Sequence, residues 1–235
     1  MLPKGILFDL DDTIIAYTPV AEPTWQRVCE EFAGSSSVLD TELLYKTIRT
    51  ISSWYWSNTK RHKEGRKNLD RTRRAILELV FQELKVSDTA LAWKIADAFS
   101  EQREEEIYLF PQALETLEYL AANNVSLAMM TNGEKIKQRS KIDKFGLEKY
   151  FKAFFIEGEL GFGKPDKEVY LGALEALGLK PEEVWAVGDN LEWDVKGPQK
   201  LGIFGIWNDV EGKGLSPSSK VTPDRIINSI AELIE

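Results

Sequence analysis

Five short apolar segments constrain the fold of this chain more than any other feature of its sequence. They comprise residues 5–10, 125–131, 153–157, 184–188 and 203–207. The segments are mostly apolar along their length, which is typical of strands buried on both faces of a parallel sheet. Stretches with helical spacing separate them. The sequence therefore predicts an α/β fold with a doubly wound parallel sheet.

Helix signals fall between the later strands. Pro111 precedes an apolar stripe of leucines, and residues 168–177 carry a second stripe. Proline is favoured at the start of a helix, and glycine is favoured just beyond its end because it readily adopts the left-handed backbone conformation. Gly146 and Gly178 stand at such positions. These signals predict helices that alternate with the strands.

The segment between the first strand and Pro111 is too long for a simple crossover connection. Residues 15–108 contain no convincing strand, whereas a crossover normally needs about a dozen residues and a helix. Helical periodicity predicts four helices there, at residues 22–33, 40–57, 70–85 and 88–105. We therefore expect an α/β core made of residues 1–14 and 109–235, and an inserted helical domain made of residues 15–108.

The composition argues against several classes of function. The 30 Lys and Arg residues against 38 Asp and Glu residues give a net charge of −8, so a small-molecule substrate is expected rather than a nucleic acid polymer. No apolar run approaches the roughly 18 residues of a membrane span, and no secretion signal is recognised. Cys29 is the single cysteine, which fits a reducing, cytoplasmic location. The sequence predicts no particular oligomeric state.

Polar clusters follow four of the predicted strands. The clusters are Asp9-Leu10-Asp11-Asp12-Thr13, Thr131-Asn132-Gly133, Gly163-Lys164-Pro165-Asp166, and Gly188-Asp189-Asn190 with Asp194. In an open α/β sheet the ligand binds beyond the carboxyl ends of the strands. We therefore expect the four clusters to meet at that edge of the sheet and to form one site.

The acidic members of these clusters predict a cation site. Asp9, Asp11, Asp189 and Asp194 are expected to converge, and two like charges about 5 Å apart repel by roughly 3 kcal/mol at an effective dielectric constant of about 20. Carboxylate ligands that leave part of the coordination shell open suit Mg²⁺, which keeps some waters and bridges to a substrate phosphate. The sequence therefore predicts Mg²⁺ as the cofactor.

The remaining polar residues of the clusters suit a phosphate group. Lys164 supplies a positive charge, and Thr131 supplies a hydroxyl donor. The backbone N–H groups of Asn132 and Gly133, at the predicted start of a helix, can surround phosphate oxygens. Together with the cation site, these residues predict phosphoryl transfer from a small phosphorylated metabolite.

The segments DLDDT, TNG, GKPD and GDNLEWD, in this order, resemble the four motifs of the haloacid dehalogenase-like hydrolase superfamily. Their order at successive strand ends makes the resemblance specific, because each short motif alone would also fit an ordinary turn. The insertion between the first two motifs resembles the α-helical C1 cap of subfamily I. The resemblance covers nearly the whole chain and implies a Rossmannoid core, a cap domain and the activity of a phosphatase on a small phosphomonoester of the nucleotide or sugar-phosphate type.

The resemblance also implies a role for each motif residue. Asp9 would attack phosphorus to form an aspartyl-phosphate, and Asp11 would protonate the leaving oxygen and then deprotonate water. Thr131 and Lys164 would hold the phosphoryl group. The carboxylates of Asp9 and Asp189 and the backbone carbonyl of Asp11 would bind Mg²⁺, and Asp194 would serve at the metal site as a second acidic partner that acts through water.

Three alternative functions follow from the same residues. Asp11 argues against dehalogenation, because a departing alkoxide needs a proton whereas a departing halide does not. A phosphomutase would use the same pair of aspartates. A receiver-like phosphoacceptor module would also combine aspartates with Thr and Lys, but the large insertion and the spacing of Asp9 and Asp11 argue against it. Trp193 and Pro198 differ from the residues that are usual in the family at these positions. They are expected to affect the geometry of the loop and not the binding of the metal.

The inserted domain carries two features that each allow two interpretations. Residues 60–74 contain eight basic and two acidic residues, and this run would either form a solvated face or steer an anionic substrate. The aromatic residues 54–56 would either pack within the domain or form a wall beside the leaving group. His62, the only histidine, is expected to be exposed rather than catalytic.

Overall fold

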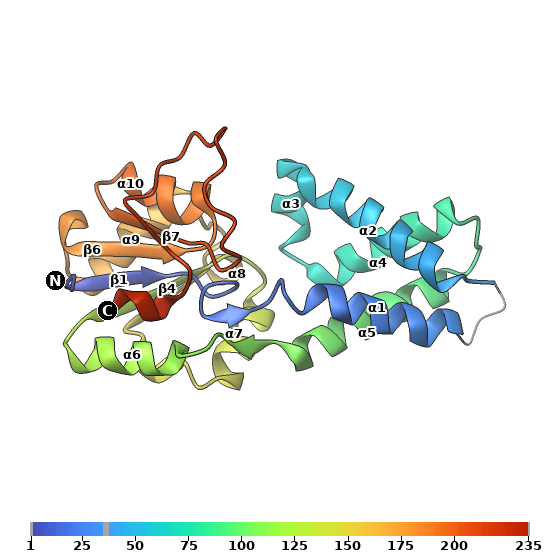
Figure 1. Ribbon diagram of the computed structural model, residues 1–235, viewed down its shortest axis with the longest axis horizontal. Coiled ribbons are helices and arrows are strands. Elements are labelled where there is room, and N and C mark those ends of the chain that lie inside the picture. The colour runs from blue at the N-terminus through green and yellow to red at the C-terminus, as the bar shows by residue number, and fades with distance from the viewer. Residues whose placement is uncertain (1, 35–37, 235) are drawn as a thin grey trace. The chain divides into compact units, whose positions relative to one another are not determined.

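The computed structural model describes residues 2–34 and 38–234 (Figure 1). The chain forms two compact units: a core unit made of Met1–Ala16 with Tyr108–Glu235, and a helical unit made of Tyr17–Ile107. The sequence predicts domain boundaries after residues 14 and 108, and the chain divides after residues 16 and 107.

A six-stranded parallel sheet forms the centre of the core unit. Its strands are β1 (Gly5–Phe8), β4 (Ser126–Thr131), β5 (Ala153–Ile156), β6 (Val184–Gly188), β7 (Phe204–Asn208) and β8 (Arg225–Ile227). They are arranged in the order β5-β4-β1-β6-β7-β8, and every neighbouring pair is parallel. The predicted doubly wound parallel sheet is confirmed. Because β1 lies between β4 and β6, the carboxyl ends of these three strands lie side by side.

The five predicted strands correspond to β1, β4, β5, β6 and β7, whereas β8 is not predicted from the sequence. This strand has only three residues, begins with Arg225 and leaves Ile226 45% exposed at the edge of the sheet. A strand this short and partly polar lacks the apolar run on which the prediction depends. Residues 212–223, a stretch rich in Gly, Ser and Pro, contain neither helix nor strand.

The helices of the core unit are α6 (Ala113–Ala122), α7 (Lys135–Lys144), α8 (Glu157–Leu160), α9 (Lys167–Leu177) and α10 (Gly197–Gln199). The register of the sheet places Leu7, Ala128 and Ala186 on one face, because each is paired directly across a parallel ladder. Tyr170 of α9 packs into the same buried cluster. Gly178 follows α9 with a φ of 71°, as predicted for a glycine that ends a helix.

A short antiparallel ladder lies where the chain leaves and re-enters the core unit. It consists of β2 (Ile15–Ala16) and β3 (Tyr108–Leu109), and the N–H of Phe110 donates to the carbonyl of Ile14 (3.0 Å) beside it. Two-residue strands are too short to be recognised from apolar periodicity. The ladder nevertheless matters for the site, because it anchors the end of the turn that follows β1.

The helical unit contains α1 (Ala21–Gly34), α2 (Thr41–Ser57), α3 (Thr59–Gly65), α4 (Leu69–Glu83) and α5 (Thr89–Glu106). Four of these helices correspond to the predicted ones. The sequence does not predict α3, because TKRHKEG has no apolar stripe. Inside the unit, Trp25 stacks on Phe99 with the ring centroids 3.7 Å apart. Within the described part of the chain, each helix is too short or too polar to cross a bilayer.

The basic run at residues 60–74 is only partly a solvated face. Arg66 and Arg73 are buried within the helical unit. The Arg73 guanidinium donates to the hydroxyl of Ser100 (2.8 Å) and to the hydroxyl of Tyr17 (3.0 Å). Because a buried charge requires such partners, Arg73 serves the internal packing of the unit, and neither interpretation of the run includes this role.

The aromatic residues 54–56 differ in their surroundings. Tyr55 and Trp56 pack against the hydrophobic core of the helical unit. Trp54 is 53% exposed, and the guanidinium of Arg61 lies 3.8 Å from the centre of its ring. His62 is half-buried and its ring lies edge-on to Trp56, with the centroids 5.4 Å apart. The expectation of an exposed histidine is therefore wrong, because packing against Trp56 covers part of the imidazole.

Candidate active site

The first polar cluster forms a tight turn directly after β1. The N–H of Asp9 donates to the carbonyl of Val187 on β6 (2.9 Å), which continues the parallel pairing beyond the strand. Leu10 is fully buried, and its carbonyl accepts the N–H of Ile14 (3.0 Å). Asp12 has a φ of 59°, a left-handed conformation that aspartate tolerates better than most residues. The turn therefore holds Asp9 at the carboxyl edge of the sheet.

Three acidic side chains meet at this edge. One carboxylate oxygen from each of Asp9, Asp189 and Asp194 lies within 4.8 Å of the other two. Asp9 is 8% exposed, Asp194 is buried as well, and Asp189 is more accessible. Hard carboxylate oxygens at this spacing fit a divalent cation. The side chain of Asp11 does not join this group, and the resemblance assigns only its backbone carbonyl to the metal.

The electrostatics of the acidic group follow from its burial. Removal from water raises the pKa of Asp9 to about 7; Lys164 opposes this shift and Asp194 adds to it. Burial, together with the charges of Asp9 and Asp194, also raises the pKa of Asp189 well above its usual range. Without a cation, the protein therefore holds part of this group in the protonated form near neutral pH.

Lys164 connects two of the three acids. Its Nζ lies 2.7 Å from Oδ1 of Asp9 and 2.6 Å from Oδ1 of Asp194, and the lysine is 2% exposed. Burial alone would lower the pKa of Lys164, but the two carboxylates outweigh it and raise the pKa above its usual value. The other oxygen of Asp194 accepts the N–H of Asn190 (3.0 Å). Lys164 is therefore a fixed positive charge beside Asp9.

Asn132 holds the backbone of Lys164 in place. Its Nδ2 donates to the Lys164 carbonyl (2.7 Å), and its Oδ1 accepts the Lys164 N–H (2.8 Å). A Cβ atom on Gly163 would lie 2.3 Å from that same Oδ1, so only glycine allows the two loops to approach this closely. The side chain of Asn132 thus joins the loop after β4 to the loop that carries Lys164.

Thr131 and Gly133 have different environments. Thr131 is buried at the end of β4, and its hydroxyl accepts a hydrogen bond from Nε2 of Gln138. The N–H of Gly133 donates to Oε2 of the buried Glu157 (3.1 Å). The amide of Gly133 is therefore already engaged, and a contact with phosphate would require this bond to be exchanged. Glu157 itself is not predicted as a site residue.

Asp11 is held by two residues of α7 that the sequence analysis does not single out. Nζ of Lys141 lies 2.8 Å from both Oδ1 and Oδ2 of Asp11. Nε2 of Gln138 donates to Oδ2 of Asp11 (3.0 Å) as well as to Thr131. Lys141 is 1% exposed, and Gln138 is buried beside it. Asp11, the residue expected to transfer the proton, is therefore paired with the buried ammonium group of Lys141.

The sequence of α7 contains a signal that would have identified these two residues. Gln138, Lys141 and Ile142 have the spacing of one helix face, and Ile142 is buried. Polar residues that share a face with a buried isoleucine, directly after a phosphate-type motif, point toward the site. The many charges of the helix conceal this face, since a basic helix is usually interpreted as solvated.

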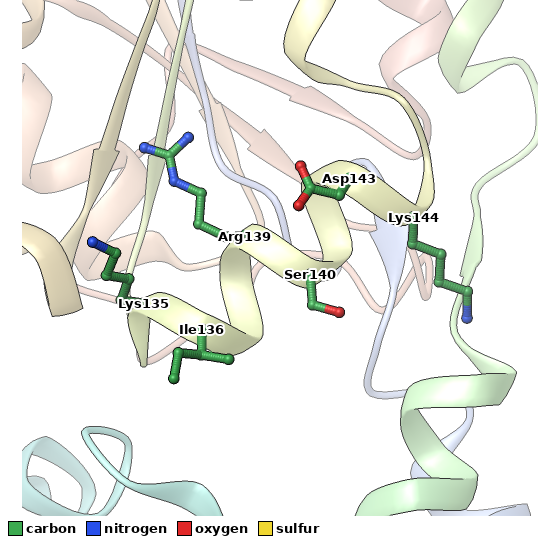
Figure 2. Close-up of a pocket in the computed structure, with 6 residues that line it drawn as sticks. All are labelled: Lys135, Ile136, Arg139, Ser140, Asp143 and Lys144. Atoms are coloured by element: carbon green, nitrogen blue, oxygen red, sulfur yellow. The ribbon is translucent and has the colours of Figure 1, made fainter.

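A surface pocket lies on the opposite side of α7. Figure 2 shows its lining side chains, all from this helix: Lys135, Ile136, Arg139, Ser140, Asp143 and Lys144. Ile136, Arg139, Ser140 and Asp143 lie on the helix face that points away from Gln138 and Lys141. None of them belongs to the acidic group. The pocket is therefore separate from the site built at the ends of the strands.

Comparison of the sequence with known proteins identifies relatives that are phosphatases. A model of the haloacid dehalogenase-like hydrolases matches residues 3–202. A glyceraldehyde 3-phosphate phosphatase of Methanopyrus kandleri is 26% identical, over 99% of this chain and 96% of that protein. A phosphoserine phosphatase of Thermus thermophilus is 29% identical, over 98% and 97% of the two chains.

A solved structure shares the architecture as well as the sequence pattern. The HAD-hydrolase YfnB of Bacillus subtilis, bound to magnesium, superposes with a TM-score of 0.74 at 26% identity, over 99% of this chain and 97% of that one. The family match spans most of the chain and includes all four polar clusters. The chain therefore belongs to the haloacid dehalogenase-like hydrolase family.

Proposed function

We propose that this protein is a magnesium-dependent phosphatase that hydrolyses a small phosphomonoester through an aspartyl-phosphate on Asp9. The observation that carries the proposal is the buried Asp9 carboxylate, bonded to Lys164 and grouped with Asp189 and Asp194. Such an arrangement presents a nucleophile beside positive charge and a cation site. The phosphatase relatives from Methanopyrus kandleri and Thermus thermophilus support the same activity.

The reaction proceeds in two displacements. An Asp9 carboxylate oxygen forms a bond to phosphorus while the bond to the ester oxygen breaks, and Asp11 gives its proton to that departing oxygen. Asp11 then takes a proton from water as the water oxygen attacks phosphorus. The bond between phosphorus and Asp9 breaks, inorganic phosphate leaves, and the Asp9 carboxylate is regenerated.

The other site residues stabilise charge during these displacements. Lys164 holds the nucleophilic carboxylate and faces the negative phosphoryl oxygens, and Thr131 offers a hydroxyl to them. Mg²⁺ held by Asp9, Asp189 and Asp194 would supply positive charge that offsets the repulsion between carboxylate and phosphate. Magnesium in the Bacillus subtilis relative supports this choice of cation.

The substrate class follows from the relatives rather than from the motif residues. The two phosphatases act on glyceraldehyde 3-phosphate and phosphoserine, which are three-carbon phosphomonoesters. We therefore place three-carbon phosphates first among the small phosphorylated metabolites, ahead of larger sugar phosphates and nucleoside monophosphates.

A phosphate-release assay over these compounds tests the proposal. Wild-type protein with Mg²⁺ should release free phosphate over many turnovers, and chelation should abolish the release. Asp9→Asn should lower kcat by on the order of 10³-fold or more, because the nucleophile is removed. Glu192→Gln removes an exposed acid from the loop of Asp189 and should leave activity near the wild-type level.

Three outcomes would contradict the proposal. An Asp9→Asn variant of undiminished activity would exclude the nucleophile. Isomerised sugar phosphate without free phosphate would indicate a phosphomutase. A stable phosphoprotein without turnover would indicate a receiver-like module.

A further inference from the structure

We propose that Lys141 is a positioning residue that holds Asp11 in place for proton transfer, with Gln138 of the same helix as its second support. The inference rests on the proposed function, in which Asp11 protonates the leaving oxygen. It assigns a role in the reaction to α7, a helix that lies outside the four motifs.

The contact between Lys141 and Asp11 restricts the carboxylate. One ammonium group lies 2.8 Å from both oxygens of Asp11, and Gln138 donates to Oδ2 alone (3.0 Å), so a displacement of the carboxylate would break a contact with Lys141 and a rotation about its bond to Cβ would break the contact with Gln138. The Asp11 side chain is 22% exposed, whereas that of Lys141 is 2% exposed. The cation therefore lies on the buried side of the carboxylate, and the carboxylate remains accessible to a substrate.

Stability alone does not account for a buried lysine at this position. Removing an ammonium group from water is costly, and an ion pair recovers that cost only when its geometry and its further hydrogen bonds are good. An apolar side chain would fill the same face of α7, next to the buried Ile142, without this cost. The contact with Asp11, a carboxylate that takes part in the reaction, accounts for a lysine at this position.

Gln138 links the proton donor to the phosphate-binding side of the site. Its single Nε2 group donates to Oδ2 of Asp11 and to the hydroxyl of Thr131. These two partners come from different strand ends, after β1 and at the end of β4. The amide therefore fixes the spacing between the residue that moves the proton and a residue that holds the phosphoryl group.

The two buried lysines of the site serve different acids. Lys164 pairs with Asp9 and Asp194, and Lys141 pairs with Asp11. Loss of Lys141 should therefore impair protonation of the leaving group while the nucleophile and the acidic group keep their partners. Such a defect depends on the leaving group of the substrate, because a good leaving group departs without a proton.

The test compares two aryl phosphates that differ mainly in their leaving group. Lys141→Met should lower kcat/KM for phenyl phosphate by about 100-fold and for 2,4-dinitrophenyl phosphate by less than about fivefold. The ratio kcat/KM reports the steps up to ester cleavage and is not affected by slow hydrolysis of the aspartyl-phosphate. Lys144→Met, on the exposed face of the same helix, is the matched control and should change neither value.

A double variant separates positioning from a general structural defect. Asp11→Asn with Lys141→Met should be no slower on phenyl phosphate than Asp11→Asn alone, because Lys141 acts through Asp11. Circular dichroism and thermal melting establish that each variant is folded. If Lys141→Met does not fold, Lys141→Gln carries the same test, with a smaller loss because the amide keeps one donor.

Equal losses on the two phosphates, additive losses in the double variant, or no loss at all would each overturn the inference. If wild type is active and Asp9→Asn is inactive, such a result leaves the proposed function standing. A wild-type protein that hydrolyses neither phosphate would overturn the proposed function and this inference with it.

Discussion

At the scale of single residues, the charge balance around Asp9 explains why this site favours a divalent cation. Asp9, Asp189 and Asp194 contribute three carboxylates, and Lys164 contributes one ammonium. Fully ionised, the group therefore keeps two uncompensated negative charges in a largely buried place. One divalent cation would balance them. When no cation is bound, protons neutralise part of this charge, and the pKa values of Asp9 and Asp189 are raised for this reason.

This balance predicts that Mg²⁺ binding weakens as the pH falls. The pKa of Asp9 is raised to about 7, so below that pH the cation must displace a proton from the carboxylate. The apparent dissociation constant should rise by about tenfold or more between about pH 8 and about pH 6, since one group of this pKa loses most of its ionised form over that interval. Titration calorimetry measures the constant and the proton released.

Two variants show whether the effect belongs to Asp9. Glu192→Gln should keep the pH dependence, because this acid is exposed and paired with Lys196. Asp9→Asn should lose the part that comes from Asp9. An affinity independent of pH over this interval would contradict the account of a buried, partly protonated acidic group.

At the scale of elements, the meeting of polar residues at the strand ends could be predicted from sequence, whereas the contribution of α7 to the site was not predicted. The apolar runs identify β1, β4 and β6, and the polar residues that follow each run must meet because neighbouring parallel strands end at one edge. Gln138 and Lys141 share a helix face with the buried Ile142, but the charges all around this helix conceal that signal. The motif residues were therefore predicted, whereas their supports were overlooked.

The close approach of two loops gives a prediction at the same scale. A Cβ atom on Gly163 would lie 2.3 Å from Oδ1 of Asn132 and 2.9 Å from Cβ of Glu157. Gly163→Ala should therefore separate the loop of Lys164 from that of Asn132 and lower kcat by about tenfold to 100-fold, as small displacements of positioned groups do. Steady-state kinetics on an aryl phosphate measure the loss.

Gly34→Ala is the matched control for this substitution. Among the described residues, a Cβ atom there meets no atom within 4 Å apart from its chain neighbours and the backbone of its own helix, and the residue ends α1 in the helical unit. It should leave kcat unchanged. Full activity of Gly163→Ala would show that the hydrogen bonds between Asn132 and Lys164 do not position the lysine.

At the scale of the whole molecule, the architecture could be predicted because its signals are long and repeated. Five apolar runs and four periodic helices define both units, and the α/β class with its parallel sheet is confirmed. The elements that escaped prediction are short or polar: β8 with Arg225, the two-residue strands β2 and β3, and α3 with its run of charges. Tertiary contacts, rather than local pattern, define these elements.

In the whole molecule, the residues proposed to carry out the reaction are not those that would select the substrate. In the proposed reaction, the residues at the strand ends act on the phosphate group, which every phosphomonoester substrate shares. The rest of the substrate must be selected by residues outside these clusters. The reaction class of the chain can therefore be inferred from its site, whereas the identity of the ester has to come from the comparison with relatives and from assays.

Direct identification of the phosphorylated residue tests the central claim most directly. Protein quenched in acid during turnover of 2,4-dinitrophenyl phosphate with Mg²⁺ is treated with borohydride, which reduces an aspartyl-phosphate to homoserine, and peptides are analysed by mass spectrometry. The account predicts homoserine at position 9 only, and none in Asp9→Asn or without substrate. Reduction at another aspartate, or rapid turnover with no reduced residue at all, would contradict it.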